Sequence, residues 1–149
     1  GIDFYNFDIR SLPDEIKQIK RKYDYIIIDS PPAITFETIQ IVKVSNGIFV
    51  PVQPSPLDLM ATLPFLQIAR DERKKPLIIL NRVMPRARLT DAMVLRLRYS
   101  GAKVARSRIS SKVIFAETFA VGRGVIDINV TSDASREIIN VGNEIVRNL

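Results

Sequence analysis

Four short apolar runs separated by helix-like patterns constrain the fold more than any other feature of the chain. The runs occupy residues 25–29, 47–52, 76–83 and 103–109. Most of them are continuously hydrophobic instead of alternating, which is typical of strands covered on both faces. Strands that alternate with helices indicate parallel pairing through crossover connections. The sequence therefore predicts an α/β fold with a doubly wound, mostly parallel sheet flanked by helices.

Helical patterns fill the segments between these runs. The predicted helices cover residues 11–22, 34–45, 57–72, 91–99, 112–120 and 132–148. Residues 2–9 fit a short strand or a loop equally well. Ser11 and Thr90 are the expected N-caps of the first and fourth helices, and Gly101 is expected to close the fourth. A length of 149 residues with 46% hydrophobic content suits one core, so we expect a single domain over residues 1–149.

Composition excludes several classes of chemistry. The chain has no cysteine and no histidine, which removes disulfide scaffolds, thiol nucleophiles, the commonest zinc ligands and any histidine-based triad. No apolar run approaches the ~20 residues that a membrane span needs, and no secretory pattern opens the chain. A cytoplasmic protein is the default expectation.

The net charge of +6 is concentrated in the middle of the chain. Residues 70–123 hold 14 Lys and Arg against 4 Asp and Glu, whereas residues 1–69 hold 6 against 8 and residues 124–149 hold 2 against 4. A basic block of this kind favours a phosphate-rich partner, above all nucleic acid, and is equally compatible with a solvated basic face.

The run 25–29 ends in a carboxylate, Asp29, which two prolines follow at 31 and 32. Proline fixes φ and donates no backbone hydrogen bond, so the chain has to leave the sheet there as a stiff loop. Open α/β sheets bind ligands at the carboxyl ends of their strands. Asp29 is therefore either a site carboxylate, of the kind that serves a Mg-nucleotide, or an ordinary turn residue.

Three ordered blocks of sequence resemble the ParA/MinD family of deviant Walker-type P-loop ATPases, and most closely its small partition proteins. The first block is Tyr-Asp-Tyr-Ile-Ile-Ile-Asp-Ser-Pro-Pro at 23–32. The second runs from Val44 to Asp58 and ends in Val-Pro-Val-Gln-Pro-Ser-Pro-Leu-Asp, and the third is Ile-Leu-Asn-Arg at 79–82. The resemblance runs from about residue 10 to the C-terminus. It implies an ATPase that uses ATP and Mg²⁺.

The resemblance also implies roles for individual residues. Asp29 corresponds to the Walker B aspartate, which orients Mg²⁺ through a bound water. Asn81 and Arg82 end the strand that contacts adenine, and Ile109 and Ser110 lie where relatives close the other side of the base. Ser110 replaces the proline usual in the family. Without the family, Asn81 reads as a turn residue and Ile109 as a core residue. Asp58 reads as a helix cap or a residue facing a dimer partner.

The phosphate-gripping loop of such ATPases is not in this sequence. The loop needs a glycine-rich turn and a lysine at the start of a helix, and the chain contains no Gly-Lys pair. Only 24 residues precede Tyr25, and the first residue is Gly, so we expect the natural protein to carry an N-terminal segment with this loop.

Two functions of different classes follow from these features. The first is a partition ATPase that forms a homodimer with ATP, binds nonspecific DNA on the nucleoid, and is stimulated by a centromere-binding partner. The expected DNA contacts are Arg86, Arg88, Arg96, Arg98, Lys103, Arg106 and Arg108. The second is a noncatalytic, degenerate relative that keeps the fold and the basic surface. A membrane role is disfavoured, because the helix over 132–148 carries three acidic residues and no basic polar face.

Overall fold

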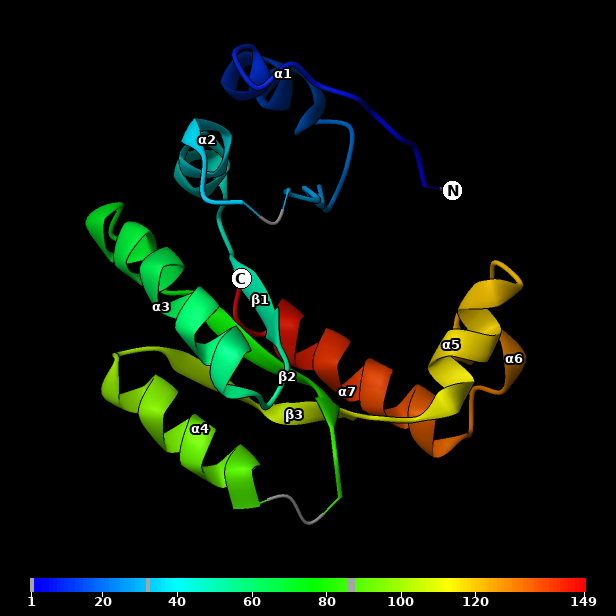
Figure 1. Ribbon diagram of the computed structural model, residues 1–149. Coiled ribbons are helices and arrows are strands. Elements are labelled where there is room, and N and C mark those ends of the chain that lie inside the picture. The colour runs from blue at the N-terminus through cyan, green and yellow to red at the C-terminus, as the bar shows by residue number, and fades with distance from the viewer. Residues whose placement is uncertain (1, 32, 86–87) are drawn as a thin grey trace. The chain divides into compact units, whose positions relative to one another are not determined.

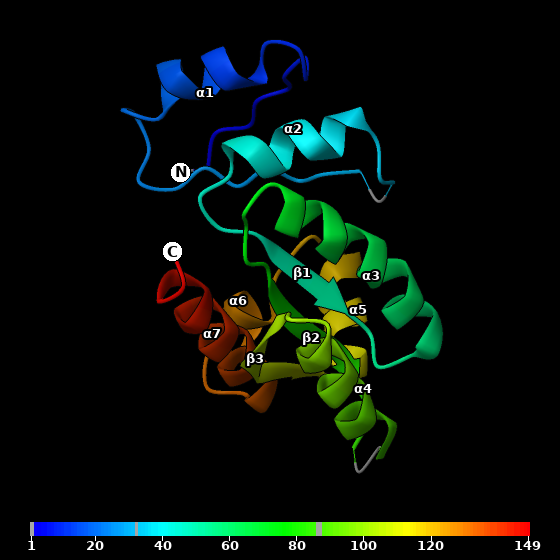
Figure 2. The same ribbon diagram turned by 90° about the vertical axis from the view of Figure 1, so that its left-hand side faces the viewer.

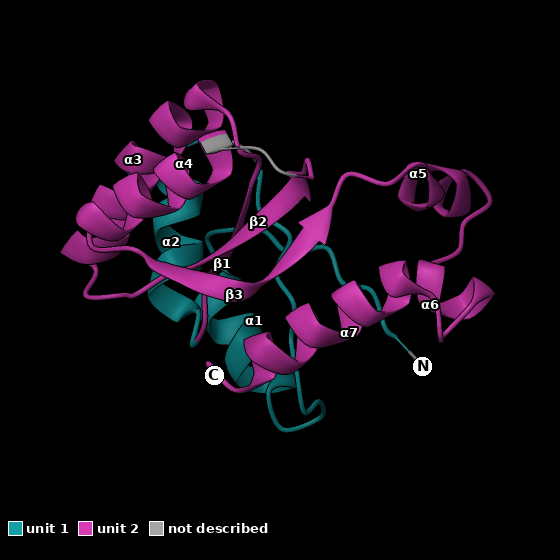
Figure 3. Cartoon of the chain, turned by 90° about the horizontal axis from the view of Figure 1, so that it is seen from below, with its two compact units in different colours: residues 1–46 teal, residues 47–149 magenta. Residues whose placement is uncertain are grey.

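The chain folds into two compact units, which are described separately. The structure is a computed structural model that describes residues 2–31, 33–85 and 88–149, with only the backbone of Arg88. Unit 1 covers residues 1–46 and unit 2 covers residues 47–149 (Figure 3). The expectation of one domain over the whole chain stays a prediction.

Unit 1 contains two helices that contact each other, α1 (Leu12–Ile19) and α2 (Phe36–Val44). The first helix ends three residues before the predicted boundary at Lys22. Before it, residues 2–8 form an irregular segment. This segment is tied to the residues after α1, because the hydroxyl groups of Tyr5 and Tyr23 lie 2.6 Å apart and Tyr23 also donates to Asp3.

The prediction of a strand at residues 25–29 is wrong. No strand is assigned there, and the side chains of Tyr25 and Ile27 are 61% and 93% exposed. A strand exists only when a neighbour completes its hydrogen-bond ladder. The described part of unit 1 holds two helices and no strand, so an apolar run with strong β propensity has no partner within its unit.

Unit 2 is built on a three-stranded parallel sheet in the order β1–β2–β3, which confirms the predicted fold class (Figure 1). The strands are β1 (Phe49–Val52), β2 (Leu77–Val83) and β3 (Lys103–Ser110). Leu77 to Leu80 of the central strand are buried on both faces of the sheet. Each such side chain contributes about 1.5–3 kcal/mol by leaving water.

Two crossover helices cover one face of the sheet, and the last helix covers the other. The crossovers are α3 (Pro56–Asp71) and α4 (Arg88–Tyr99), whereas α7 (Asp133–Val146) lies on the opposite side (Figures 1 and 2). The alternation along β2 explains this sandwich. Ile78 and Leu80 belong to the core beneath α3 and α4, and Leu77 and Ile79 belong to the core beneath α7.

The start of α4 differs from the prediction. Thr90 is the expected cap, yet the helix already begins at Arg88, and Thr90 is an interior residue with 2% exposure. Its hydroxyl makes no hydrogen bond within the described residues. The predicted end of the helix is confirmed, because Gly101 adopts a left-handed φ of +82° and its amide donates to Arg98.

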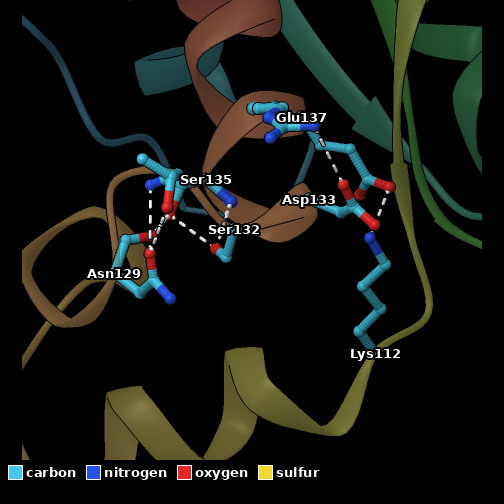
Figure 4. A network of polar contacts seen from close by, with 8 residues as sticks. Lys112, Asn129, Ser132, Asp133, Ser135 and Glu137 are labelled. Atoms are coloured by element: carbon cyan, nitrogen blue, oxygen red, sulfur yellow. Dashed lines mark hydrogen bonds and ion pairs between the residues drawn. The ribbon is translucent and has the colours of Figure 1, made fainter.

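Two short helices connect β3 to α7. They are α5 (Val113–Ala120) and α6 (Val125–Ile128), and both lie beyond the carboxyl end of β3 (Figure 1). The segment between the predicted helices 112–120 and 132–148 therefore contains an extra helical turn, α6. α7 begins within one residue of its predicted start, and Ser132 caps it, because its hydroxyl accepts a hydrogen bond of 3.1 Å from the amide of Ser135 (Figure 4).

Candidate functional site

The carboxyl ends of β2 and β3 lie side by side and form the candidate site of unit 2. Val83 pairs with Ser110, and the amide of Ser111 donates to the carbonyl of Val83 over 3.0 Å. Parallel pairing thus brings the two predicted adenine-contact segments, 81–82 and 109–110, to one edge of the sheet.

Asn81 and Arg82 interrupt the regular geometry of β2. The Asn81 side-chain oxygen accepts a hydrogen bond from the amide of Arg82, at 2.9 Å. Arg82 has a φ of +52°, and the strand register shifts between Leu80 and Val83. A left-handed non-glycine residue costs about 1–2 kcal/mol and is concentrated at functional positions. The side chain of Arg82 is exposed, and that of Asn81 is half-buried.

Ser110 is held by a carboxylate that the sequence prediction missed. Its amide and hydroxyl donate to the two oxygens of Glu137, at 2.9 and 2.8 Å. The Lys112 ammonium donates to the same carboxylate at 2.8 Å (Figure 4). Partial burial by itself raises the pKa of Glu137, but the hydrogen bonds from Lys112 and Ser110 outweigh it and hold the pKa below its ordinary value. Ile109, which precedes Ser110 in β3, packs into the core beneath α7.

Glu144 repeats this arrangement two turns further along α7. Its carboxylate oxygens accept hydrogen bonds from the backbone amides of Arg106 and Ser107, both at 2.8 Å. Burial raises the pKa of Glu144, but the hydrogen bonds from Ser107 and Arg106 and the charge of Arg106 together outweigh it, so the net pKa lies below the ordinary value. The sequence signal for these two residues is their spacing of seven, because side chains seven apart share one face of a helix and can contact the same neighbouring element.

The two aspartates singled out in the sequence have different surroundings. Asp29 is exposed in the irregular segment between α1 and α2 of unit 1. Asp58 takes part in capping α3, whose N-cap is Ser55: the Asp58 amide donates to Ser55 Oγ at 3.0 Å, and the Asp58 carboxylate accepts from Gln53 N at 2.9 Å. Among the described residues, no cluster of three or more His, Cys, Asp or Glu side chains can hold a metal ion.

The predicted DNA-contact residues divide between two sides of unit 2. Arg86 lies outside the described residues, as does the side chain of Arg88. Arg96 and Arg98 are exposed on α4. Arg108 of β3 lies on the same side, because its guanidinium is 4.0 Å from the carboxylate of Asp91 in α4. The remaining two face the other way: Arg106 lies beside α7, and Lys103 donates to Asn148 just past the end of that helix. The described basic residues therefore form two groups instead of one patch.

Comparisons with known proteins agree with this architecture. A family model described as an AAA domain matches residues 6–79. The maintenance of carboxysome distribution protein A of Halothiobacillus neapolitanus is 26% identical over 138 residues, which cover 88% of this chain and 64% of the relative.

Solved structures of cell division proteins have the same fold. The MinD ATPase of Pyrococcus furiosus superposes with a TM-score of 0.78 at 19% identity, covering 95% of this chain and 60% of that structure. MinD of Aquifex aeolicus gives 0.74 at 20% identity, covering 94% and 61%. The chain thus spans about three fifths of the proteins it matches. No helix in the described residues has the length and apolarity to cross a membrane.

Proposed function

The chain belongs to the ParA/MinD family of deviant Walker-type P-loop ATPases, and on that premise we propose that the native protein is a partition ATPase. It binds ATP with Mg²⁺, forms a homodimer in that state, and binds nonspecific DNA to segregate a plasmid or a chromosome. A centromere-binding protein stimulates its hydrolysis, and the protein is cytoplasmic and associated with the nucleoid.

The proposal is carried by the adjacent carboxyl ends of β2 and β3. There the half-buried amide of Asn81 has the donor and acceptor groups that pair with an adenine edge, and Ile109 and Ser110 lie on the neighbouring strand. Asp29 is exposed, which fits a carboxylate that holds a metal-bound water. When bound, Mg²⁺ neutralises charge on the β and γ phosphates.

The residues present suit binding of the adenine base and of a metal-bound water, but they include no phosphate-binding loop. The 149 residues contain no Gly-Lys pair, so the proposal concerns the native-length protein. Within the chain itself, Asn81 and Arg82 orient the base, Asp29 holds a water, and Glu137 fixes Ser110 in place.

ATP hydrolysis by the native-length protein tests the role of Asp29. Asp29→Asn removes the charge that positions the metal-bound water, so kcat is expected to fall by about two orders of magnitude, since metal positioning contributes several kcal/mol. Asp24→Asn is the matched control, because Asp24 is also exposed and lies in the same irregular segment. Equal activity of the two variants would exclude the role of Asp29.

ATP binding separates the proposal from its alternative, a noncatalytic relative that keeps the fold. Crosslinking of ATP to the native-length protein, with the site mapped by mass spectrometry, is expected to label peptides that contain Asn81 or Ser110. A protein that neither crosslinks nor hydrolyses ATP is the degenerate module.

DNA binding rests on the two basic groups, one with Arg96, Arg98 and Arg108 on the α4 side, and one with Lys103 and Arg106 on the α7 side. Phosphate contacts by such residues release counterions, so affinity for a random duplex should fall steeply between 50 and 200 mM salt, as expected of charge-driven binding. Arg96→Gln with Arg98→Gln should weaken binding to every sequence alike. Salt-insensitive binding, or none with ATP, contradicts this part of the proposal.

The cargo needs its own test. The carboxysome named in the relative's description supports a positioning role in general, and our proposal assigns a plasmid or chromosome as cargo here. Deletion of the gene is expected to raise the loss rate of a replicon. If the replicon is inherited normally but carboxysome-like protein assemblies are mislocalised, the cargo is such an assembly instead of a plasmid or chromosome.

A further inference from the structure

An open groove of about 360 Å³ runs between β3 and the C-terminal half of α7. Its walls combine two guanidinium groups, three carboxamides and one carboxylate. These groups belong to Arg106, Asn140, Asn143, Glu144, Arg147 and Asn148. The groove is separate from the strand ends at which nucleotide binding is proposed.

Three of the polar side chains in this groove are available to a ligand. In the part of the chain that the structure describes, the side chains of Asn140, Asn143 and Arg147 make no hydrogen bond or ion pair. All three are exposed. Two further groups are engaged, because Glu144 holds the backbone amides of β3 and Asn148 donates to the carbonyl of Glu144 at 2.6 Å.

The three free side chains form one stripe with Arg136 along α7 and its C-cap residue, Arg147. Arg136, Asn140, Asn143 and Arg147 follow a spacing of four, three and four residues, which places them on one face of a helix. Asp133 and Glu144 flank this stripe, each three residues before one of its arginines. Only Arg136 lies outside the groove, where it pairs with Asp133 at 3.4 Å.

We infer that this groove binds an extended acidic peptide segment of a partner protein. Guanidinium groups pair with carboxylates through two parallel hydrogen bonds, which suits Arg106 and Arg147 to Asp and Glu side chains. A carboxamide offers a donor and an acceptor together, which matches the amide groups of a peptide backbone and suits Asn140 and Asn143.

The charge around the groove favours a short acidic segment over a nucleic acid. Residues 124–149, which include α7, hold 2 basic against 4 acidic residues. Of these two basic residues, Arg147 lines the groove and Arg136 lies outside it. A duplex laid along α7 would bring phosphates close to Asp133 and Glu137. A peptide a few residues long occupies the groove without reaching those carboxylates.

Fluorescence anisotropy of the native-length protein with a labelled six-residue peptide of alternating Glu and Asp tests the inference, with the matching Gln and Asn peptide as its control. The acidic peptide is expected to bind at least tenfold more tightly than the neutral one. Arg147→Gln should weaken it about tenfold or more, because a charge-assisted bond is lost. Arg136→Gln removes the same charge from the same helix outside the groove and should change affinity less than twofold.

A second readout locates the peptide directly. In ¹⁵N-resolved spectra, the side-chain amide signals of Asn140 and Asn143 are expected to move on addition of the acidic peptide, and those of Asn46 to stay fixed. Equal losses for Arg147→Gln and Arg136→Gln, or equal binding of both peptides, would overturn the inference. So would a short DNA duplex that binds the groove more tightly than the peptide does. The measurement needs no ATP, so its failure is distinct from failure of the ATPase proposal.

Discussion

Glu137 and Glu144 lie two turns apart on α7, and both turn their carboxylates toward backbone amides of β3. Glu137 accepts from Ser110, and Glu144 accepts from Arg106 and Ser107. β3 ends the described sheet on this side, so these amides have no neighbouring strand. Two glutamates thus supply the acceptors that a further strand would otherwise offer.

Removing the Glu144 carboxylate is expected to lower the free energy of unfolding by about 2 kcal/mol, since two charge-assisted hydrogen bonds to the backbone are lost. Urea unfolding of Glu144→Ala at pH 7 measures the change. Glu117→Ala, on the exposed side of α5, should stay within about 0.5 kcal/mol of the wild type. Equal stability of both variants would mean that water replaces the carboxylate without cost.

The stabilisation from Glu137 is expected to depend on pH in one direction. Its folded-state pKa lies below the ordinary value of 4.5, so its contribution is present above that value and is lost as pH falls through the folded pKa. The free energies of unfolding of the wild type and of Glu137→Gln should therefore differ at pH 7 and converge as the pH is lowered below the folded pKa. A difference that persists unchanged below the folded pKa contradicts an ionised carboxylate as the source.

Two buried threonines should respond oppositely to replacement by valine. The Thr90 hydroxyl is buried without a hydrogen bond among the described residues, so Thr90→Val should stabilise unit 2 by about 1 kcal/mol. The Thr62 hydroxyl donates to the carbonyl of Asp58 at 2.7 Å, and Thr62→Val should destabilise by about the same amount. Thermal unfolding of the pair measures the sign. Destabilisation by Thr90→Val would indicate a water at that hydroxyl.

Two glycines form a second pair with opposite expectations. Gly101 has a φ of +82°, so Gly101→Ala forces an L side chain into the left-handed region at a cost of about 1 kcal/mol. Gly142 lies inside α7 with open space at its Cβ, so Gly142→Ala should stabilise by up to about 1 kcal/mol through helix propensity. Circular dichroism melts compare the two. A stable Gly101→Ala protein would require a different end to α4.

The fold of unit 2 could be predicted because its signals are local. The continuous apolar runs at 47–52 and 76–83 and the more polar run at 103–109 predicted β1, β2 and β3 within two residues, and Ser132 and Gly101 marked true helix ends. The failures have nonlocal causes. Residues 25–29 carry strand propensity but lack a neighbour to pair with, and Thr90 is buried by tertiary packing instead of standing at a helix start.

The candidate site was predictable only in part, for a similar reason. The sequence places Asn81 and Ser110 at strand ends, and parallel pairing brings those ends together. It gives no direct sign that Glu137 and Glu144 reach across from α7, because such contacts depend on the helix lying against the β3 edge. The bulge in β3 between Val104 and Arg108 likewise follows from its pairing with β2.

The glutamates of α7 also determine at which edge a further strand can join the sheet. Three amides on the outer side of β3, at residues 106, 107 and 110, already have carboxylate acceptors, so an incoming strand would have to displace charged partners to pair there. The other margin of the described sheet is β1, whose only strand partner in unit 2 is β2. Any strand that enlarges this sheet, whichever chain supplies it, is therefore expected to add beside β1.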